Sequence, residues 1–215
     1  MEWLQPAPQP IGLFDTFTAR QTEVLVIDEK LLSLSGDSFD IRLANGMPLL
    51  KVKGSVLSLS GRKEVTDMLG NHMFTISKKI LSLHATFAVT NGTGQSIMEV
   101  KNSLVQRRTI LFRNTCLLCF TNHPLCSNTV IGSKATITFT SRTGKYETLV
   151  MRGNWRSSKA DIVDEATGFV VARIKRDRTA KHYLMGAQTY TVTIAPGVDM
   201  ALVAAMCICL DEKNE

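Results

Sequence analysis

Three cysteines and one histidine in the middle of the chain have the residue types of a zinc site. Cys116, Cys119 and Cys126 are spaced C-x2-C-x6-C, and His123 lies between the last two. Two cysteines separated by two residues are typical of a zinc knuckle. However, residues 116–120 are apolar and strand-like, and residues three apart on a strand face opposite sides. We therefore favour buried structural thiols over a zinc site, and we expect no bound metal.

The histidines do not lie in a catalytic pattern. His72, His84, His123 and His182 are outside any nucleophile elbow or HExxH motif. His72 lies at a turn signal and is expected to be solvated, whereas His84 follows a strand-like run and is expected to be structural. The glycines are isolated turn residues and do not form a phosphate-binding loop. We therefore expect no catalytic residue, no enzymatic activity and no cofactor.

The best functional candidate is a basic segment in the last quarter of the chain. Its basic residues are Arg173, Lys175, Arg176, Arg178 and Lys181. Clustered cations attract anionic lipid headgroups, at about 1 kcal/mol for each Lys or Arg near the surface. Lys78 and Lys79, and also Arg107 and Arg108, would add to this site if folding brings them close. The alternative is that all of these are solvated loop charges, as most such runs are.

The overall charge agrees with an anionic partner. The chain carries 25 basic and 19 acidic residues, a formal net charge of +6, and its pI is about 9.2. Such a charge favours a membrane surface or a nucleic acid without choosing between them. Tyr183 is the one aromatic residue beside the basic segment, and no recognition-helix pattern occurs. We therefore expect no nucleic-acid partner.

One apolar segment near the C-terminus is expected to be buried inside the fold that positions these residues. Residues 200–210 carry no polar side chain on any face, and Asp199 precedes them. A carboxylate at that position suits the free N–H groups at the start of a helix. A surface helix would show a polar stripe, and a membrane span needs about 20 apolar residues. The sequence therefore predicts a fully buried helix over about residues 198–210, and no transmembrane segment.

The chain before this helix alternates polar and apolar residues with a period of two. The clearest strand patterns cover residues 23–27, 38–43, 49–53, 73–77, 85–89, 96–100, 135–140, 148–152, 169–175 and 189–194. Turn signals such as Asn45-Gly46 separate them. With weaker segments included, this is about a dozen short strands at the spacing of an antiparallel barrel or sandwich. A closed barrel around the helix buries both apolar surfaces and removes sheet edges. We predict a mainly-β fold, an antiparallel barrel of about twelve strands that encloses a hydrophobic C-terminal α-helix.

The chain divides into a short tail and one domain. Residues 1–20 contain prolines at alternating positions and predict a Pro-rich tail, from which Ile11, Leu13 and Phe14 could dock on the domain. No linker interrupts residues 21–215, which we expect to form a single barrel domain. The odd number of cysteines and the lack of a signal-peptide pattern predict a cytoplasmic, reduced protein. We expect a monomer that attaches to membranes only peripherally.

Several motifs resemble a known family. They are Phe39-Asp40-Ile41 before Asn45-Gly46, the segments LKVKG at 50–54 and KKILSLH at 78–84, and YTVTIAPGVD at 190–199 before the apolar helix. Over about residues 20–212 the chain resembles the LURP-one-related family of the tubby C-terminal-like superfamily, which also includes the phospholipid scramblases. The resemblance implies a twelve-stranded barrel around a central helix. The family's biochemical activity is poorly defined, so the resemblance implies more about fold than about function.

The resemblance also suggests which ligand to expect. Tubby-type domains bind phosphoinositides, and scramblases are associated with an acidic calcium loop before the last helix. Here residues 173–182 hold one acid, Asp177, among basic residues, which disfavours a calcium site. We expect a non-enzymatic tubby-like module that binds anionic phospholipid or acts as a regulatory adaptor. The alternatives are a protein–protein interaction scaffold and a scramblase-like lipid transporter, the latter requiring residues 198–210 to leave the core.

Overall fold

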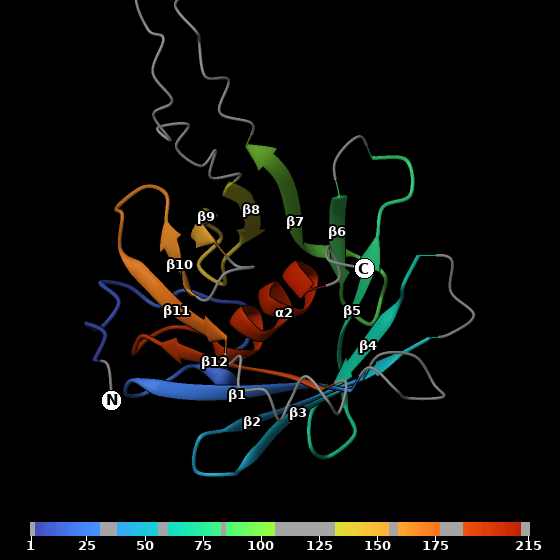
Figure 1. Cartoon of the computed structure of the whole chain (residues 1–215), viewed down its shortest axis with the longest axis horizontal. Coiled ribbons are helices and arrows are strands. Elements are labelled where there is room, and N and C mark those ends of the chain that lie inside the picture. The colour runs from blue at the N-terminus through green and yellow to red at the C-terminus, as the bar shows by residue number, and fades with distance from the viewer. Residues whose placement is uncertain are drawn as a thin grey trace, which may run out of the picture.

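Twelve antiparallel strands close into a barrel around one central helix in the computed structural model of the chain (Figure 1). The structure describes residues 3–30, 38–55, 60–82, 85–105, 132–154, 159–176 and 187–211. The strands are β1 (Glu23–Lys30), β2 (Ser38–Leu43), β3 (Pro48–Gly54), β4 (Lys63–Thr66), β5 (His72–Lys78), β6 (Ala85–Thr90), β7 (Ser96–Val105), β8 (Gly132–Thr140), β9 (Tyr146–Asn154), β10 (Lys159–Asp164), β11 (Val170–Arg176) and β12 (Ala187–Ile194). A 3-10 helix, η1 (Asp15–Phe17), precedes β1, and α2 (Met200–Asp211) ends the order. Each strand pairs with its sequence neighbours and β12 pairs with β1, which confirms the predicted barrel.

The period-two pattern of the sequence sets which side chains enter the barrel. On β1, Leu25 and Ile27 are buried, and Ile27 lies directly opposite Ile41 of β2 and Tyr190 of β12. Leu25 is likewise opposite Val192 of β12. Because successive side chains on a strand point to opposite faces, a slip of one residue would turn these apolar side chains outward. The buried pattern therefore fixes the register around the barrel.

The apolar helix fills the barrel, as Figure 1 shows for α2 at the centre of the ring of strands. Every residue from 200 to 210 is 8% exposed or less. The uniform burial explains why the sequence shows no polar stripe, since no face of α2 meets water. Cys207 and Cys209 are buried in this helix and are not joined in a disulfide. Asn102 of β7 donates a hydrogen bond from Nδ2 to the Cys209 carbonyl oxygen (3.4 Å), which places the end of α2 beside β7.

Residues 3–20, which we call the N-terminal clasp, cover the start of α2. The Ile11 N–H donates to the Gly197 oxygen (3.0 Å), and the Asp199 N–H donates to the Ile11 oxygen (2.9 Å). On the other side, the Ala19 N–H donates to the Val198 oxygen (2.9 Å). The predicted docking is present, with Ile11 in the core and Leu13 and Phe14 packed against it. The clasp thus adds short backbone pairings on both sides of the segment that leads into α2.

Asp199 joins the clasp to the helix. Its side chain is fully buried, and Oδ1 accepts hydrogen bonds from the N–H groups of Ala201 (2.8 Å) and Leu202 (3.2 Å). This is the predicted helix cap. Oδ2 accepts from the N–H groups of Leu13 (2.8 Å) and Phe14 (2.7 Å) in the clasp. Burial raises the pKa of the Asp199 carboxyl above its ordinary value, while these four backbone donors oppose that shift.

Gly12 is required where the clasp crosses Asp199. A Cβ at position 12 would lie 2.1 Å from the Asp199 Cβ and 2.9 Å from Oδ2. No side chain fits at that distance unless the backbone of the clasp moves. The absence of a Cβ at residue 12 therefore permits the close approach that brings the next two N–H groups to the carboxylate.

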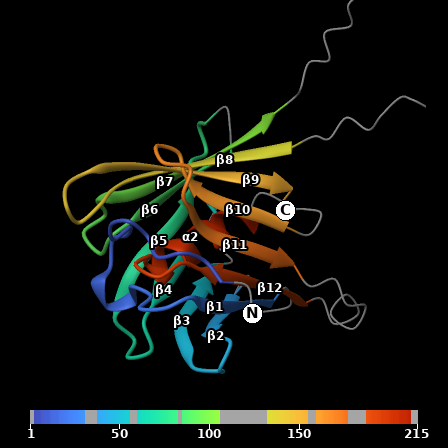
Figure 2. The same cartoon turned by 90° about the vertical axis from the view of Figure 1, so that its left-hand side faces the viewer.

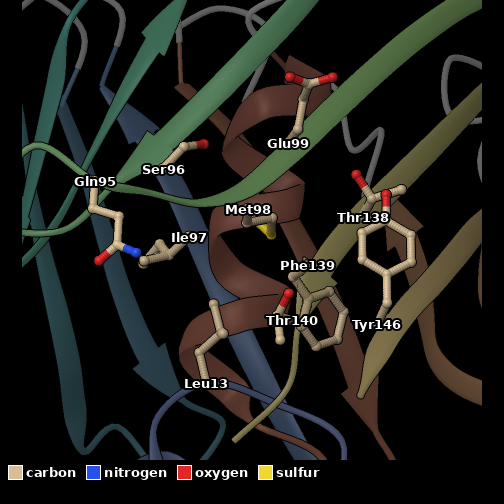
Figure 3. A pocket seen from close by; sticks show the side chains of 10 residues that line it. All are labelled: Leu13, Gln95, Ser96, Ile97, Met98, Glu99, Thr138, Phe139, Thr140 and Tyr146. Carbon is tan, nitrogen blue, oxygen red and sulfur yellow. The ribbon is translucent and has the colours of Figure 1, made fainter. Parts of the chain in front are cut away.

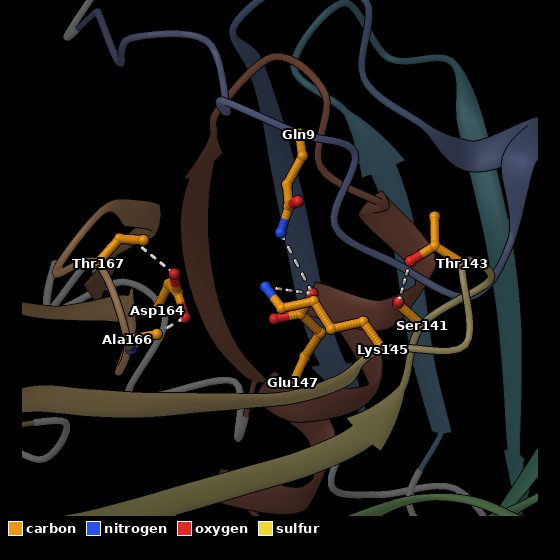
Figure 4. A network of polar contacts seen from close by, with 8 residues as sticks. All are labelled: Gln9, Ser141, Thr143, Lys145, Glu147, Asp164, Ala166 and Thr167. Atoms are coloured by element: carbon orange, nitrogen blue, oxygen red, sulfur yellow. Dashed lines mark hydrogen bonds and ion pairs between the residues drawn. The ribbon is translucent and has the colours of Figure 1, made fainter.

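The two ends of the barrel differ in what surrounds them. In Figure 2 the clasp (blue) lies at one end, and β9 and β11 point away from it toward the other. At the clasp end, Gln9 donates from Nε2 to buried Glu147 (3.4 Å), and Lys145 pairs with the same carboxylate (3.2 Å; Figure 4). Asp164, also buried, accepts hydrogen bonds from residues of the turn that follows β10. We call this the closed end. Among the described helices none is long and apolar enough to cross a membrane.

Candidate anion-binding site

Basic side chains gather at the end of the barrel where α2 ends. Odd-numbered strands end and even-numbered strands begin there, so residues far apart in sequence meet at one rim. We define the basic rim as Lys53 on β3, Arg62 before β4, Lys78 and Lys79 at the end of β5, Lys101 on β7, Arg152 on β9, Lys159 on β10, and Arg173 and Lys175 on β11. The acidic side chains described at this end are fewer: Asp28, Asp40, Glu64, Glu99 and Asp161. The rim therefore carries a net positive charge.

The closed end has the opposite charge balance. Its described acids are Asp15, Glu23, Asp67, Glu147, Asp164, Glu165 and Asp199, and its described basic residues are Arg20, Arg42, Arg142 and Lys145. Three of these four cations are already paired, Arg42 with Asp28, Arg142 with Asp15 and Lys145 with Glu147. An anionic surface would accordingly attract the basic rim and repel the closed end.

On β11 the predicted basic residues have different environments. Arg173 faces outward because its neighbour Ile174 is buried in the barrel. Its guanidinium makes a two-pronged contact with Asp161 of β10, Nε to Oδ1 at 2.7 Å and Nη2 to Oδ2 at 3.0 Å. Arg173 is thus largely neutralised by a carboxylate. Lys175 also faces outward, directly opposite Lys159 of β10 in the strand register.

Lys159 and Lys175 form the most suggestive pair of the rim. Lys159 is exposed and Lys175 is partly buried. The register places the two lysines side by side on the outer face of the barrel, where one anion can contact both. Arg176 continues β11 toward the rim, with its backbone opposite Tyr190. Arg178 and Lys181 lie outside the described residues, as do Arg107 and Arg108.

Lys78 and Lys79 share the rim with β11 but not the same side of the barrel. Both are exposed at the end of β5. In the closed strand order β5 lies six strands from β11, which is directly across the barrel. Folding therefore does not merge the two basic groups into one pocket. It places them on opposite sides of one rim, with the end of α2 between them.

Lys79, the residue after β5, belongs to a small charged network with Glu99 and Lys101 of β7. Its Nζ pairs with Oε2 of Glu99, and Lys101 Nζ lies 2.9 Å from Oε1 of the same carboxylate. Hydrogen bonds from Lys79 and then Lys101 hold the pKa of Glu99 below its ordinary value. Two lysines thus share one acid, and the network keeps a net positive charge.

A groove of about 340 Å³ lies beside the first residues of β7 and the last residues of β8 (Figure 3). Leu13 of the clasp, Met98 and Phe139 form its apolar floor, and Glu99 and Tyr146 are among its polar residues. Both oxygens of Glu99 are already paired with lysines. A carboxylate with a lowered pKa and two cationic partners is a poor proton acceptor near neutral pH, so the groove offers little for general-base chemistry.

The other residues considered for chemistry are only partly described. His72 is the exposed first residue of β5, with Nε2 2.9 Å from the Thr75 hydroxyl. His84, His123 and His182 lie outside the described residues, and so do Cys116, Cys119 and Cys126. The preference for structural thiols over zinc at those cysteines therefore stays a prediction. Within the described ranges, no three His, Cys, Asp or Glu side chains are placed to hold a metal ion.

Comparison with known proteins identifies the family. The family model for LURP-one-related proteins matches residues 23–211. The chain belongs to the LURP-one-related family. It is 25% identical over 211 residues to Protein LURP-one-related 15 of Arabidopsis thaliana, covering 97% of this chain and 89% of that protein. It is 23% identical over 190 residues to Protein LURP-one-related 10 of the same plant, covering 88% and 89%.

A solved structure shares the fold of this LURP-one-related chain. An X-ray structure of an Arabidopsis thaliana protein superposes with a TM-score of 0.55 at 18% identity, covering 96% of this chain and 99% of the other. At that identity the likeness supports the barrel architecture alone. The basic rim is accordingly argued from the residues of this LURP-one-related chain.

Several rim residues carry no recognisable sequence signal. Lys101, Arg152 and Lys159 are single basic residues on three different strands. Only the strand order and register place them at one end of the barrel with Lys175. The basic residues of 173–181 can be recognised from the sequence because they lie close together in it. Basic residues on separate strands, which only the fold brings together, cannot.

Proposed function

We propose that this LURP-one-related barrel is a non-enzymatic, tubby-like module that binds anionic phospholipid at a membrane surface through the basic rim. The observation that carries the proposal is the separation of charge between the two ends of the barrel. A cation near an anionic leaflet contributes roughly 1 kcal/mol. Several rim residues acting together would hold the domain at such a surface, with the closed end facing away.

The layout of the rim favours a surface over one small ligand. Lys78 and Lys79 lie across the barrel from Lys159 and Lys175. One headgroup cannot reach both sides, whereas a membrane presents many headgroups in a plane. Within that plane, the Lys159–Lys175 pair suits a phosphate group. A phosphoinositide is the anionic lipid whose headgroup carries phosphate groups in addition to the phosphodiester.

Two features support this function over the alternatives. Because α2 is enclosed along its length, lipid transport by this helix would require the barrel to open. Because Glu99 is paired with two lysines, the groove beside it offers little for general-base chemistry. We propose a cytoplasmic domain that attaches peripherally and works as a monomer.

Sedimentation of the full-length chain with vesicles tests the proposal. We expect binding to phosphatidylcholine vesicles that contain phosphatidylserine or a phosphoinositide, and none to phosphatidylcholine alone. At equal total lipid charge, the phosphoinositide vesicles should bind more protein. Binding should weaken several-fold from about 0.1 M to about 0.5 M salt, because salt screens exposed charges. Equal binding to neutral and anionic vesicles, or no binding to either, would contradict the proposal.

A second candidate, a protein-interaction scaffold, is favoured by one observation at the closed end. Met47 on the β2–β3 turn and Met68 and Leu69 on the β4–β5 turn are exposed apolar side chains on successive hairpins. Exposed methionines adapt readily to partner surfaces. This surface is remote from the basic rim, so the scaffold and the lipid-binding functions are compatible with one another.

A further inference from the structure

Two adjacent apolar residues on the basic rim have no packing role. Ile80 is 68% exposed and Leu81 is 101% exposed, the latter being as open as in an extended chain. Single exposed apolar residues are ordinary on protein surfaces, but adjacent ones at the tip of a turn beside charged residues commonly mark a contact site. They follow directly after Lys78 and Lys79 at the end of β5.

The turn that carries them is fixed to the barrel on both sides. The Lys78 N–H donates to the Ser60 oxygen (2.9 Å), and the Lys79 N–H donates to the Thr86 oxygen at the start of β6 (2.8 Å). The hydroxyls of Ser82 and Thr86 are 2.8 Å apart. The exposure of Ile80 and Leu81 is therefore imposed by hydrogen bonds next to the turn.

The charges around the turn that carries Ile80 and Leu81 indicate which kind of surface it contacts. Lys78, Lys79 and Lys101 stand beside it, and Glu99 is the acid among them. An apolar tip flanked by lysines is the residue pattern of segments that bind anionic membrane interfaces, where apolar groups reach the acyl boundary and cations stay with the headgroups. At the closed end, Leu69 is similarly exposed (88%), but it adjoins Asp67 rather than lysines.

We propose that Ile80 and Leu81 insert into the acyl boundary of an anionic bilayer while Lys78 and Lys79 contact its headgroups. The proposal rests on the membrane-binding function above and deepens it, because it assigns part of the binding to apolar insertion. Insertion at this turn brings the β5 side of the rim closest to the membrane. Lys159 and Lys175, across the rim, then contact headgroups without insertion.

The test compares two matched double variants of the full-length chain on phosphatidylserine-containing vesicles. Ile80→Ser/Leu81→Ser removes the tip, and Met68→Ser/Leu69→Ser makes the same kind of change at the closed end. We expect the first to weaken the vesicle partition coefficient about tenfold or more, since burying one such side chain typically changes an equilibrium by that factor. The second should change it less than about twofold. Both sites are exposed turns, so both variants should fold.

A fluorescence measurement separates insertion from simple contact. In Leu81→Trp, brominated lipid should quench emission beyond the wild-type level, and in Leu69→Trp it should not. Binding by the wild type with no extra quenching at residue 81, and no loss in Ile80→Ser/Leu81→Ser, would overturn insertion and leave the basic rim as the binding surface. No binding by the wild type to any anionic vesicle would overturn the proposed function and insertion together.

Discussion

Replacement of Asp199 by asparagine should detach the N-terminal clasp while α2 stays capped. The carboxylate accepts two N–H groups from the helix start and two from Leu13 and Phe14. An asparagine has one oxygen, and its NH2 group would face two N–H donors on one side. Each buried donor left without an acceptor costs about 1–3 kcal/mol. We expect a loss of roughly 2–6 kcal/mol in the free energy of unfolding, measured by urea denaturation.

Asp67→Asn is the matched control. Asp67 also accepts backbone N–H bonds, from Leu69 and Asn71 at 2.9 and 2.8 Å, but in an exposed turn where water can replace them. Its free energy of unfolding should change far less. In addition, the amides of Leu13 and Phe14 should lose hydrogen-exchange protection only in Asp199→Asn. Equal effects of the two substitutions would mean that Asp199 does not hold the clasp.

Substitution of Ala204 by aspartate should largely unfold the domain. Ala204 is fully buried in the middle of α2, inside the closed barrel. An aspartate there would be an unpaired buried carboxyl, which must either be desolvated as an anion or take up a proton at neutral pH. The larger side chain also overpacks a filled core. A loss of about 5 kcal/mol or more would remove most of the stability of an ordinary domain.

The same substitution at an exposed alanine provides the control. Ala44 lies in the turn between β2 and β3, and Ala44→Asp should leave the thermal midpoint nearly unchanged. Calorimetry or circular dichroism melting of both variants gives the comparison. A thermal midpoint for Ala204→Asp close to that of the wild type would mean that α2 is not enclosed in solution.

The helix and most of the strands can be predicted from the sequence because their burial is reflected in the local order of apolar and polar residues. Residues 200–210 have no polar face, and ten strands alternate clearly. β4 and β10 carry weaker patterns, because each has a charged residue at an inward position. In β4 an inward position is held by Lys63, which is buried with Nζ 5.2 Å from the centre of the Phe39 ring. In β10 the register shifts between Ile162 and Val163, and the inward Asp164 is a buried acid.

The candidate site is less predictable because it depends on contacts between distant residues. The basic segment is visible in sequence, but the pairing of Arg173 with Asp161 requires the register of β10 and β11. Lys159 joins the site for the same reason. Asp199 can be recognised as a cap from sequence, whereas its bonds to Leu13 and Phe14 span 186 and 185 residues. No local pattern contains such contacts.

The central claim is that the basic rim binds anionic phospholipid. A charge reversal at the rim, compared with the same reversal at the closed end, tests this claim most directly. Lys159→Glu and Arg20→Glu change the net charge equally, at the basic rim and at the closed end respectively. Lys159→Glu should fold, because Lys159 is exposed and the new carboxylate lies opposite the cationic Lys175.

The measurement is the partition coefficient of each variant on phosphoinositide-containing vesicles. With about 1 kcal/mol per charge, Lys159→Glu should weaken binding about 30-fold, since the site changes by two charges. Arg20→Glu should weaken it less than about threefold, as distant charges are screened. That difference is what an anion-binding rim predicts. Equal losses in the two variants, or full binding by Lys159→Glu, would contradict it.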